Sequence, residues 1–149
     1  MNSSVAPPLP DKIFSMNANE FLIEDKPLIY SCSGCSSAAQ MANYLAVQMD
    51  RKGLAEMSCI AGVGGNVKGL VRTAVSGRKI VVLDGCPVAC AKACLQNHGV
   101  QPDVHIELTG LGVKKKLQED FDKQQAAEIL NRLQEEVYLL QPSATTCSI

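Results

Sequence analysis

The stretch of residues 79–94 constrains the fold most, because it predicts a buried β-strand that turns directly into a helix. Its apolar run, residues 80–83, lies between charged residues on one side and an Asp-Gly pair on the other, a pattern typical of a strand covered on both faces of a parallel sheet. Pro87 has the fixed φ favoured at the first position of a helix, so we expect the helix to begin there with Cys86 as its N-cap. The free N–H groups at such a helix start favour a negatively charged ligand, and a thiolate is one.

Strand and helix signals alternate four times along the chain. We expect strands at residues 27–31, 55–61, 80–83 and 104–109, each followed by a helix, the last at 122–140. Alternation of this kind, with connections of a few residues, favours a mostly parallel sheet with right-handed crossovers. The sequence therefore predicts an α/β fold. We expect a single three-layer Rossmann- or flavodoxin-like domain whose sheet has about four strands in the order 2-1-3-4.

This domain is expected to span residues 24–140 of the 149-residue chain. Residues 1–23 begin with a Ser- and Pro-bearing segment and are predicted to form a partly disordered N-terminal extension. Residues 141–149 form a Ser/Thr-rich tail that we expect to be flexible. A hydrophobic content of 46% is enough to bury a core in a domain of this size.

Charge and composition restrict the class of function. The formal charge of −1, the absence of Trp and the 4% of aromatic residues supply neither a basic footprint nor stacking platforms, which argues against nucleic-acid binding. No apolar run approaches the roughly 18 residues of a membrane span, and the first twenty residues do not resemble a signal peptide. We therefore expect a cytoplasmic protein that binds no membrane. Seven cysteines in a reducing compartment then indicate metal binding or thiol chemistry rather than a disulfide framework.

Five of the seven cysteines follow the carboxyl ends of three predicted strands. Parallel strands end at one edge of their sheet, where doubly wound domains place their binding sites. The candidate metal ligands are Cys32, Cys35, Cys59, Cys86 and Cys90. Four thiolates suit a tetrahedral zinc ion, so we predict a Zn²⁺ site for which Cys32 and Cys35 compete. An iron–sulfur cluster also uses four cysteines and is the alternative cofactor.

Thiol chemistry is the alternative function. Cys32 and Cys35 have the Cys-x-x-Cys spacing of a redox-active pair at a helix N-terminus. A thiol redox enzyme, or a carrier of sulfur or selenium, would use this pair or Cys86. The sequence identifies no substrate and no protein partner for either function.

The remaining candidates are assigned structural roles. Cys94 lies about 12 Å along the helix from Cys86, too far for both to bind one metal ion, and is expected to be buried. His98 is expected to cap the end of that helix, and His105 to lie more than about 10 Å from the edge that carries the site. The glycines within residues 62–65 are interpreted as a tight turn rather than a phosphate cradle, because the third glycine of the dinucleotide fingerprint is missing.

The central motif carries a resemblance to a known family. With its Asp-Gly-Cys-Pro sequence at residues 84–87, the chain resembles the DGC-domain family, which is named for this motif and credited with zinc binding. The resemblance covers about residues 27–140 and includes the segments at 30–34, 59–62 and 108–112. It implies four chelating cysteines, best matched here by Cys32, Cys59, Cys86 and Cys90, with Cys35 and Cys94 as additional thiols. It implies zinc without implying a reaction.

Overall fold

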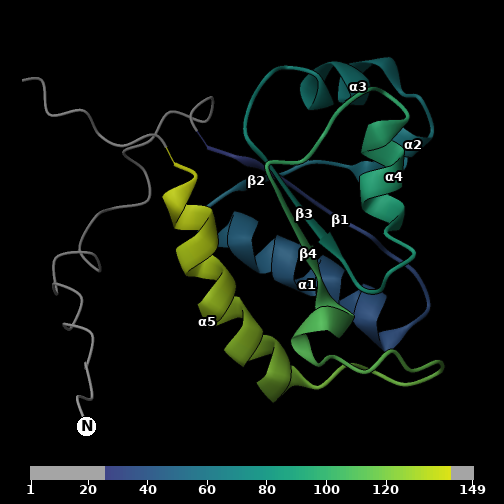
Figure 1. The fold of residues 1–149 in the computed structure, drawn as a ribbon, viewed down its shortest axis with the longest axis vertical. Helices are drawn as coiled ribbons and strands as arrows, with labels where there is room; N and C mark the ends of the chain where they lie inside the picture. The colour runs from purple at the N-terminus through teal and green to yellow at the C-terminus, as the bar shows by residue number, and fades with distance from the viewer. Residues whose placement is uncertain (1–25, 142–149) are drawn as a thin grey trace, which may run out of the picture.

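Four parallel strands lie at the centre of the computed structural model, which describes residues 26–141 (Figure 1). They are β1 (Leu28–Ser31), β2 (Glu56–Met57), β3 (Ile80–Asp84) and β4 (Val104–Glu107). Their order in the sheet is β2-β1-β3-β4, which confirms the predicted order. Every residue of β1 and β3 is buried, as expected for central strands that are covered on both faces.

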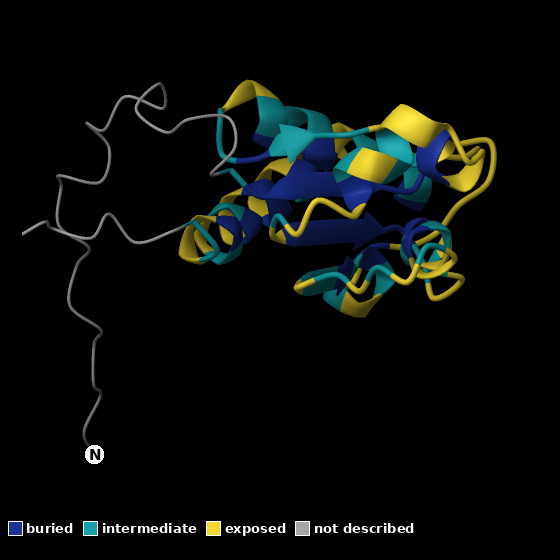
Figure 2. Ribbon diagram, turned by 90° about the horizontal axis from the view of Figure 1, so that it is seen from above, coloured by how far each residue is buried: buried dark blue, intermediate teal, exposed yellow. Residues whose placement is uncertain are grey.

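Helices cover both faces of this sheet, and the three-layer α/β prediction is confirmed (Figures 1 and 2). Helices α1 (Ser37–Arg51) and α5 (Lys123–Leu139) pack against each other on one face. On the other face, α2 (Ile60–Gly64) packs against α3 (Lys68–Ala74) and α4 (Cys90–Gln96). Right-handed crossovers place α1 on one face and α2, α3 and α4 on the other, because the chain moves one way along the sheet from β1 to β2 and the other way from β2 to β3 and β4.

Local sequence signals explain the two long helices. Ser36 caps α1 by accepting a hydrogen bond from the Ala39 N–H at 3.2 Å, and Asp122 caps α5 by accepting one from the Gln125 N–H at 2.9 Å. The apolar stripe of α5 is buried over most of its length, at Ala126, Leu130, Leu133 and Val137. Both helices therefore form where their periodicity and caps predict.

The two edge strands are shorter than predicted. The strand expected at residues 55–61 ends at Met57, because Cys59 becomes the N-cap of α2. The strand expected at 104–109 ends at Glu107, whose carboxylate accepts a hydrogen bond from the Thr109 N–H at 2.8 Å and starts the 3₁₀-helix η4 (Leu108–Leu111). In both places a side chain that caps a helix ends the strand early.

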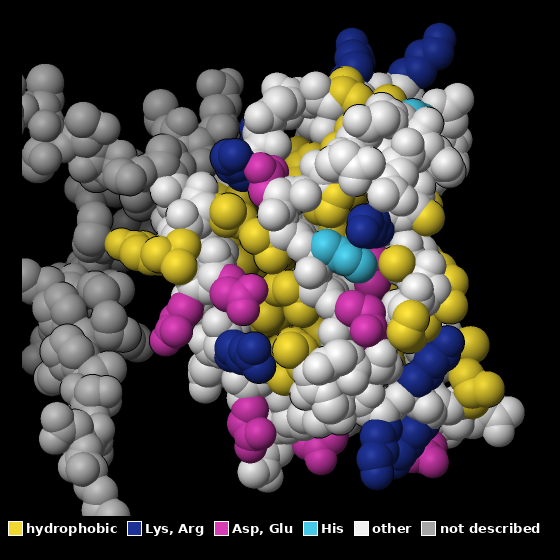
Figure 3. All heavy atoms as spheres, in the orientation of Figure 1, with side chains coloured by type: hydrophobic (Ala, Val, Ile, Leu, Met, Phe, Trp, Pro, Cys, Tyr) yellow, Lys and Arg dark blue, Asp and Glu magenta, His cyan; other side chains and the backbone are white. Residues whose placement is uncertain are grey.

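Charged side chains hold together the amino ends of the strands. The carboxylate of Asp103, just before β4, accepts hydrogen bonds from the Ile80 N–H at 2.8 Å and from the Lys79 ammonium at 2.9 Å. Arg78, before β3, pairs with Glu56 of β2 at 2.7 Å and donates to the Lys26 carbonyl, also at 2.7 Å. These contacts link the starts of all four strands at one edge of the sheet. Over the face seen in Figure 3, acidic and basic side chains are interspersed.

Some predictions fall on the chain ends. The N-terminal extension at residues 1–23, most of the tail at 141–149, and Cys147 lie outside the described residues. Within residues 26–141, no helix combines the length and apolarity that a membrane span needs.

Candidate functional site

The carboxyl ends of β1 and β3 bring two cysteine-bearing loops together. Cys32 follows β1, and its N–H donates to the Leu83 carbonyl at 3.0 Å, so the ladder continues one residue past the strand. Its sulfur accepts a hydrogen bond from the Gly85 N–H at 3.1 Å. The Cys32 side chain is thereby enclosed between the two loops, and the residue is only 8% exposed.

The surroundings of Cys32 include two of the other candidate thiols. Burial raises the pKa of the Cys32 thiol to about 11, although the Gly85 N–H opposes the shift. Three neighbours add to the rise through their charge, namely Asp84, Cys90 and Cys86. A thiol with so high a pKa is protonated at neutral pH, which argues against Cys32 as the attacking group of a redox pair.

Only a glycine fits at position 85. A Cβ atom on Gly85 would lie 2.6 Å from the carbonyl carbon of Ala38 and 2.7 Å from the amide nitrogen of Ala39, both in the first turn of α1. The loop after β3 therefore lies directly against the start of α1. This contact places Cys86 beside the loop that carries Cys32 and Cys35.

Helix α4 begins at Cys90, so the predicted start at Pro87 is wrong. Residues 86–89 instead form a turn in which the Ala89 N–H donates to the Cys86 carbonyl at 3.0 Å. Ala89 is in the left-handed region at φ 52° and offers no side-chain cap. Cys86 is consequently a turn residue rather than an N-cap, and Cys90 is the first helical residue.

Asp84, the last residue of β3, supplies the missing cap. Its Oδ1 accepts a hydrogen bond from the Ala91 N–H at 2.9 Å, and its Oδ2 accepts one from the Lys92 N–H at 3.2 Å. A carboxylate at this position also complements the positive end of the helix dipole. Sequence reasoning missed this role because the capping side chain lies six residues before the helix rather than next to it.

The two histidines are placed differently from the predictions. His105 reaches the site, because its Nε2 lies 2.9 Å from the Asp84 Oδ2. The prediction considered only the position of His105 along β4. It did not consider the Asp84 side chain on the neighbouring strand β3, where Asp84 is paired with Glu107 of β4. His98 lies at the other end of α4, where its Nε2 is 2.9 Å from the Val63 carbonyl of α2.

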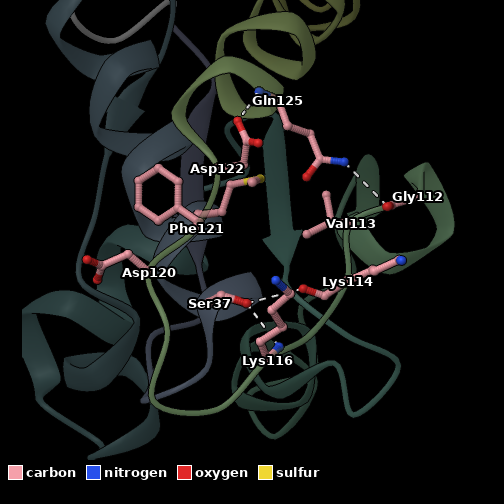
Figure 4. Close-up of a pocket in the computed structure, with 10 residues that line it drawn as sticks. Ser37, Gly112, Val113, Lys114, Lys116, Asp120, Phe121, Asp122 and Gln125 are labelled. Carbon is pink, nitrogen blue, oxygen red and sulfur yellow. Dashed lines mark hydrogen bonds between the residues drawn. The ribbon is translucent and has the colours of Figure 1, made fainter.

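A segment between η4 and α5 lies across this edge, and we call residues 113–117 the lysine loop. Lys115 donates from its ammonium to the Cys86 sulfur at 3.4 Å. Ser37, at the start of α1, anchors the loop: its Oγ donates to the Lys114 carbonyl at 3.1 Å and accepts from the Lys116 N–H at 3.0 Å (Figure 4). The lysine loop therefore carries a positive charge to a candidate ligand.

A pocket of about 230 Å³ lies between the lysine loop, α1 and α5 (Figure 4). Met41, Val113 and Phe121 supply its apolar lining. The polar side chains above them are already engaged, since Asp122 caps α5 and the Gln125 amide donates to the Gly112 carbonyl at 3.4 Å. No cysteine lines this pocket, so it is separate from the thiol site.

Cys35, on the same loop as Cys32, and Cys59, on the loop after β2, are both exposed. Cys59 caps α2, and its sulfur accepts a hydrogen bond from the Gly62 N–H at 3.4 Å. Cys35 directly precedes Ser36, the N-cap of α1. In the part of the chain that the structure describes, no three Cys, His, Asp or Glu side chains form a group that could hold a metal ion as they stand. The four-thiolate site stays a prediction.

Cys94 and the glycines of α2 belong to the packing of the helices. A Cβ atom on Gly64 would lie 2.9 Å from the Cys94 sulfur, so this glycine allows α2 to approach α4. Cys94 is half-buried, and burial raises the pKa of its thiol. A Cβ atom on Gly62 would overlap the Leu70 side chain of α3. Close helix packing thus accounts for these two glycines without a phosphate ligand.

Comparisons with known proteins agree with this architecture. The model of the DGC domain matches residues 28–133. A Pseudomonas aeruginosa (strain PAO1) protein, the anaerobic and virulence modulator AnvM, is 55% identical over 108 residues, which cover 72% of this chain and 82% of that protein. No solved structure matches the chain. The domain match includes both central strands and the Asp84–Pro87 motif, and the chain therefore belongs to the DGC domain family.

Proposed function

We propose that this protein binds one zinc ion through cysteine thiolates at the carboxyl edge of its sheet. Cys32, Cys86 and Cys90 are the central ligands, and Cys59 or Cys35 completes the set. The observation that carries this proposal is that a sulfur at each of three strand ends accepts an N–H hydrogen bond. The donors are Gly85 for Cys32, Gly62 for Cys59 and Lys115 for Cys86.

Such hydrogen bonds fit thiolates better than thiols. A thiol is a weak acceptor, whereas donors aimed at sulfur orient metal-bound thiolates and offset their charge. Four thiolates around Zn²⁺ carry a net charge of −2, and the Lys115 ammonium at 3.4 Å from Cys86 reduces it. The set also consists of soft sulfur ligands, which select zinc or iron–sulfur clusters over magnesium or calcium.

The elements that carry these cysteines explain what the metal would do. Cys32 follows β1, Cys59 begins α2, and Cys90 begins α4, so one ion would join segments far apart in the sequence. A bound zinc ion supplies a fixed positive charge and four strong bonds. Because Cys32 must lose its proton to become a ligand, we expect zinc binding to release protons and to strengthen as the pH rises.

Metal analysis tests the proposal. Protein purified without added metal is assayed for zinc and iron per chain and for visible absorbance, which would mark an iron–sulfur cluster. We expect one zinc per chain in the native protein and loss of zinc in Cys32→Ser, Cys86→Ser and Cys90→Ser. Cys94→Ser is the matched control, because it removes a thiol from the same helix and should retain zinc. Native protein that remains zinc-free after zinc is supplied would refute the proposal.

A second candidate function is thiol redox chemistry, which the contact between Lys115 and Cys86 favours. An ammonium at 3.4 Å stabilises negative charge on sulfur, and this also suits an attacking thiolate. The relative AnvM is named for anaerobic modulation, a role that a zinc site or a thiol could serve. Thiol titration with and without a chelator separates the two functions: zinc ligands become reactive only after chelation, whereas a redox thiol reacts before it.

A further inference from the structure

Asp84 is fully buried and its carboxylate accepts three hydrogen bonds. Two come from the N–H groups of Ala91 and Lys92 in the first turn of α4. The third partner is His105 of β4, whose Nε2 lies 2.9 Å from Oδ2. Oδ2 already accepts the Lys92 N–H, so the imidazole meets it with Nε2 as the donor. The three donors come from two elements, and together they fix the orientation of the carboxylate.

Helix α4 depends on this carboxylate because it has little else to fix its start. It has only seven residues, its N-cap is Ala89 at φ 52°, and that alanine provides no hydrogen-bond acceptor in its side chain. A helix this short is marginal without tertiary support. Cys90 is its first residue, so the position of the Cys90 sulfur follows the position of the first turn.

The contact with His105 is shorter than the contact with Lys92 at the same oxygen, 2.9 Å against 3.2 Å. Without the imidazole, Oδ2 would keep only the longer contact, and the carboxylate would be held by the two N–H groups of α4 alone. The first turn of α4 would then have no link to β4 through Asp84. His105 itself is partly exposed, with 23% of its side chain accessible, so it supports a fully buried group from the rim of the site.

We propose that His105 is a positioning residue for the thiol site: it orients Asp84, which fixes the first turn of α4 and thereby Cys90. This inference rests on the proposed function, since Cys90 is a candidate zinc ligand. His105 acts through two intermediates, Asp84 and the first turn of α4. Its effect on affinity should therefore resemble that of other groups that orient the ligands of a metal.

The test compares three substitutions of His105 with a control histidine. His105→Ala removes the contact outright. His105→Asn also removes it, because the amide nitrogen of asparagine reaches only about as far as the histidine Nδ1, which is short of Nε2. His105→Gln places an amide nitrogen at about the reach of Nε2 and should restore the contact. His98→Ala is the matched control, because it removes a histidine contact of 2.9 Å from the other end of the same helix.

Two quantities are measured for each variant. The first is zinc affinity by competition with a chelator, which we expect to fall about tenfold in His105→Ala and His105→Asn and to stay near the native value in His105→Gln and His98→Ala. The second is hydrogen exchange of the Ala91 and Lys92 amides in zinc-free protein. Both amides should exchange faster in His105→Ala and His105→Asn, while the Cys32 amide in the sheet should not.

The outcomes separate this inference from the proposed function. Zinc binding by the native protein with unchanged affinity in His105→Ala and His105→Asn would overturn the positioning role alone. Failure of the native protein to bind zinc would refute the proposed function, and amide exchange would still decide whether His105 orders α4. If His105→Ala does not fold, His105→Asn and His105→Gln provide the same comparison. Equal loss of affinity in His98→Ala would also overturn the proposal, since general loosening of α4 would then explain the effect.

Discussion

The two edges of the sheet are built in different ways. At the amino edge, the chain enters β2, β3 and β4 through glycines with positive φ, namely Gly53, Gly77 and Gly99. At the carboxyl edge, the residue with positive φ beside the thiols is Ala89, for which that conformation is strained. The amino edge thus uses residues that fit their backbone, and the carboxyl edge accepts strain next to its cysteines.

The polar contacts differ in the same way. At the amino edge, Asp103 pairs with Lys79 and Arg78 pairs with Glu56, and both also bond backbone groups at the strand starts, which contributes to stability. At the carboxyl edge, N–H donors point instead at the sulfurs of Cys32 and Cys86. Backbone strain of this kind clusters at functional sites, so the contrast supports the proposal that the thiols at the carboxyl edge form the site.

The largest effect is expected from Gly85→Ala, which should break the carboxyl edge. The new Cβ would lie 2.6 Å from the backbone of Ala38, and backbone cannot move aside as a flexible side chain can. We expect a loss of about 3 kcal/mol in the free energy of unfolding, measured by urea denaturation. Gly34→Ala is the control on the neighbouring loop, because its Cβ would lie 3.7 Å from the nearest atom, an ordinary contact. Equal stability of the two variants would contradict the packing described for Gly85.

Asp84→Asn should have the next largest effect. An asparagine has one acceptor oxygen for three donors, and its amide group would face an N–H or the His105 ring. We expect a loss of about 2 kcal/mol, because hydrogen bonds to a buried charge are lost and a donor is left unpaired. The loss should be accompanied by faster hydrogen exchange in the first turn of α4. A change below about 0.5 kcal/mol would show that the carboxylate does not hold the helix.

The region around Gly85 and Asp84 also shows which features of the fold the sequence does not predict. The starts of α1 and α5 were predictable, because apolar periodicity and the adjacent caps Ser36 and Asp122 are local signals, and the strand order follows a common order of doubly wound sheets. The start of α4 was not, since its cap is a strand residue six positions away and its N-cap residue is an alanine at φ 52°.

The partner of His105 was unpredictable for a related reason. Its contact with Asp84 depends on the pairing of β3 with β4, and no pattern within β4 indicates it. The convergence of cysteine loops was predictable from topology alone. The finer arrangement was not: Cys32 is buried and feels the charges of Cys86 and Cys90, whereas Cys35, Cys59 and Cys90 are themselves exposed.

At the amino edge, Asp103→Asn should have a smaller effect that depends on pH. Partial burial raises the pKa of Asp103, but hydrogen bonds from Lys79 and the Ile80 N–H outweigh burial and lower it below 3.8. The stabilisation from the charge is therefore complete above the unfolded pKa and is lost as the pH falls through the folded pKa. We expect Asp103→Asn to cost about 0.5–1 kcal/mol at pH 7, since the pair is partly exposed, and to match the native protein near pH 2.

Denaturation of both proteins across this range measures the difference. If Asp103→Asn loses the same free energy of unfolding at pH 7 and at pH 2, the shape of the side chain rather than its charge explains the role of Asp103. Zinc content should be unchanged in Asp103→Asn, because the substitution lies at the opposite edge from the thiols. Loss of zinc in this variant would break the distinction between a stabilising edge and a functional one.

The smallest effect should come from relieving the strain at the carboxyl edge with Ala89→Gly. A left-handed alanine costs about 1–2 kcal/mol, and glycine removes this cost but gives up about 0.5–1 kcal/mol through its larger conformational freedom in the unfolded chain. We therefore expect a net gain of about 0.5 kcal/mol in the free energy of unfolding. Ala93→Gly, four residues later in the interior of α4 and exposed, has no strain to relieve and should lose about 1 kcal/mol. A gain in the free energy of unfolding for Ala89→Gly with a loss for Ala93→Gly would locate the strain at Ala89. A loss of stability in both variants would mean that the carboxyl edge is no more strained than the amino edge.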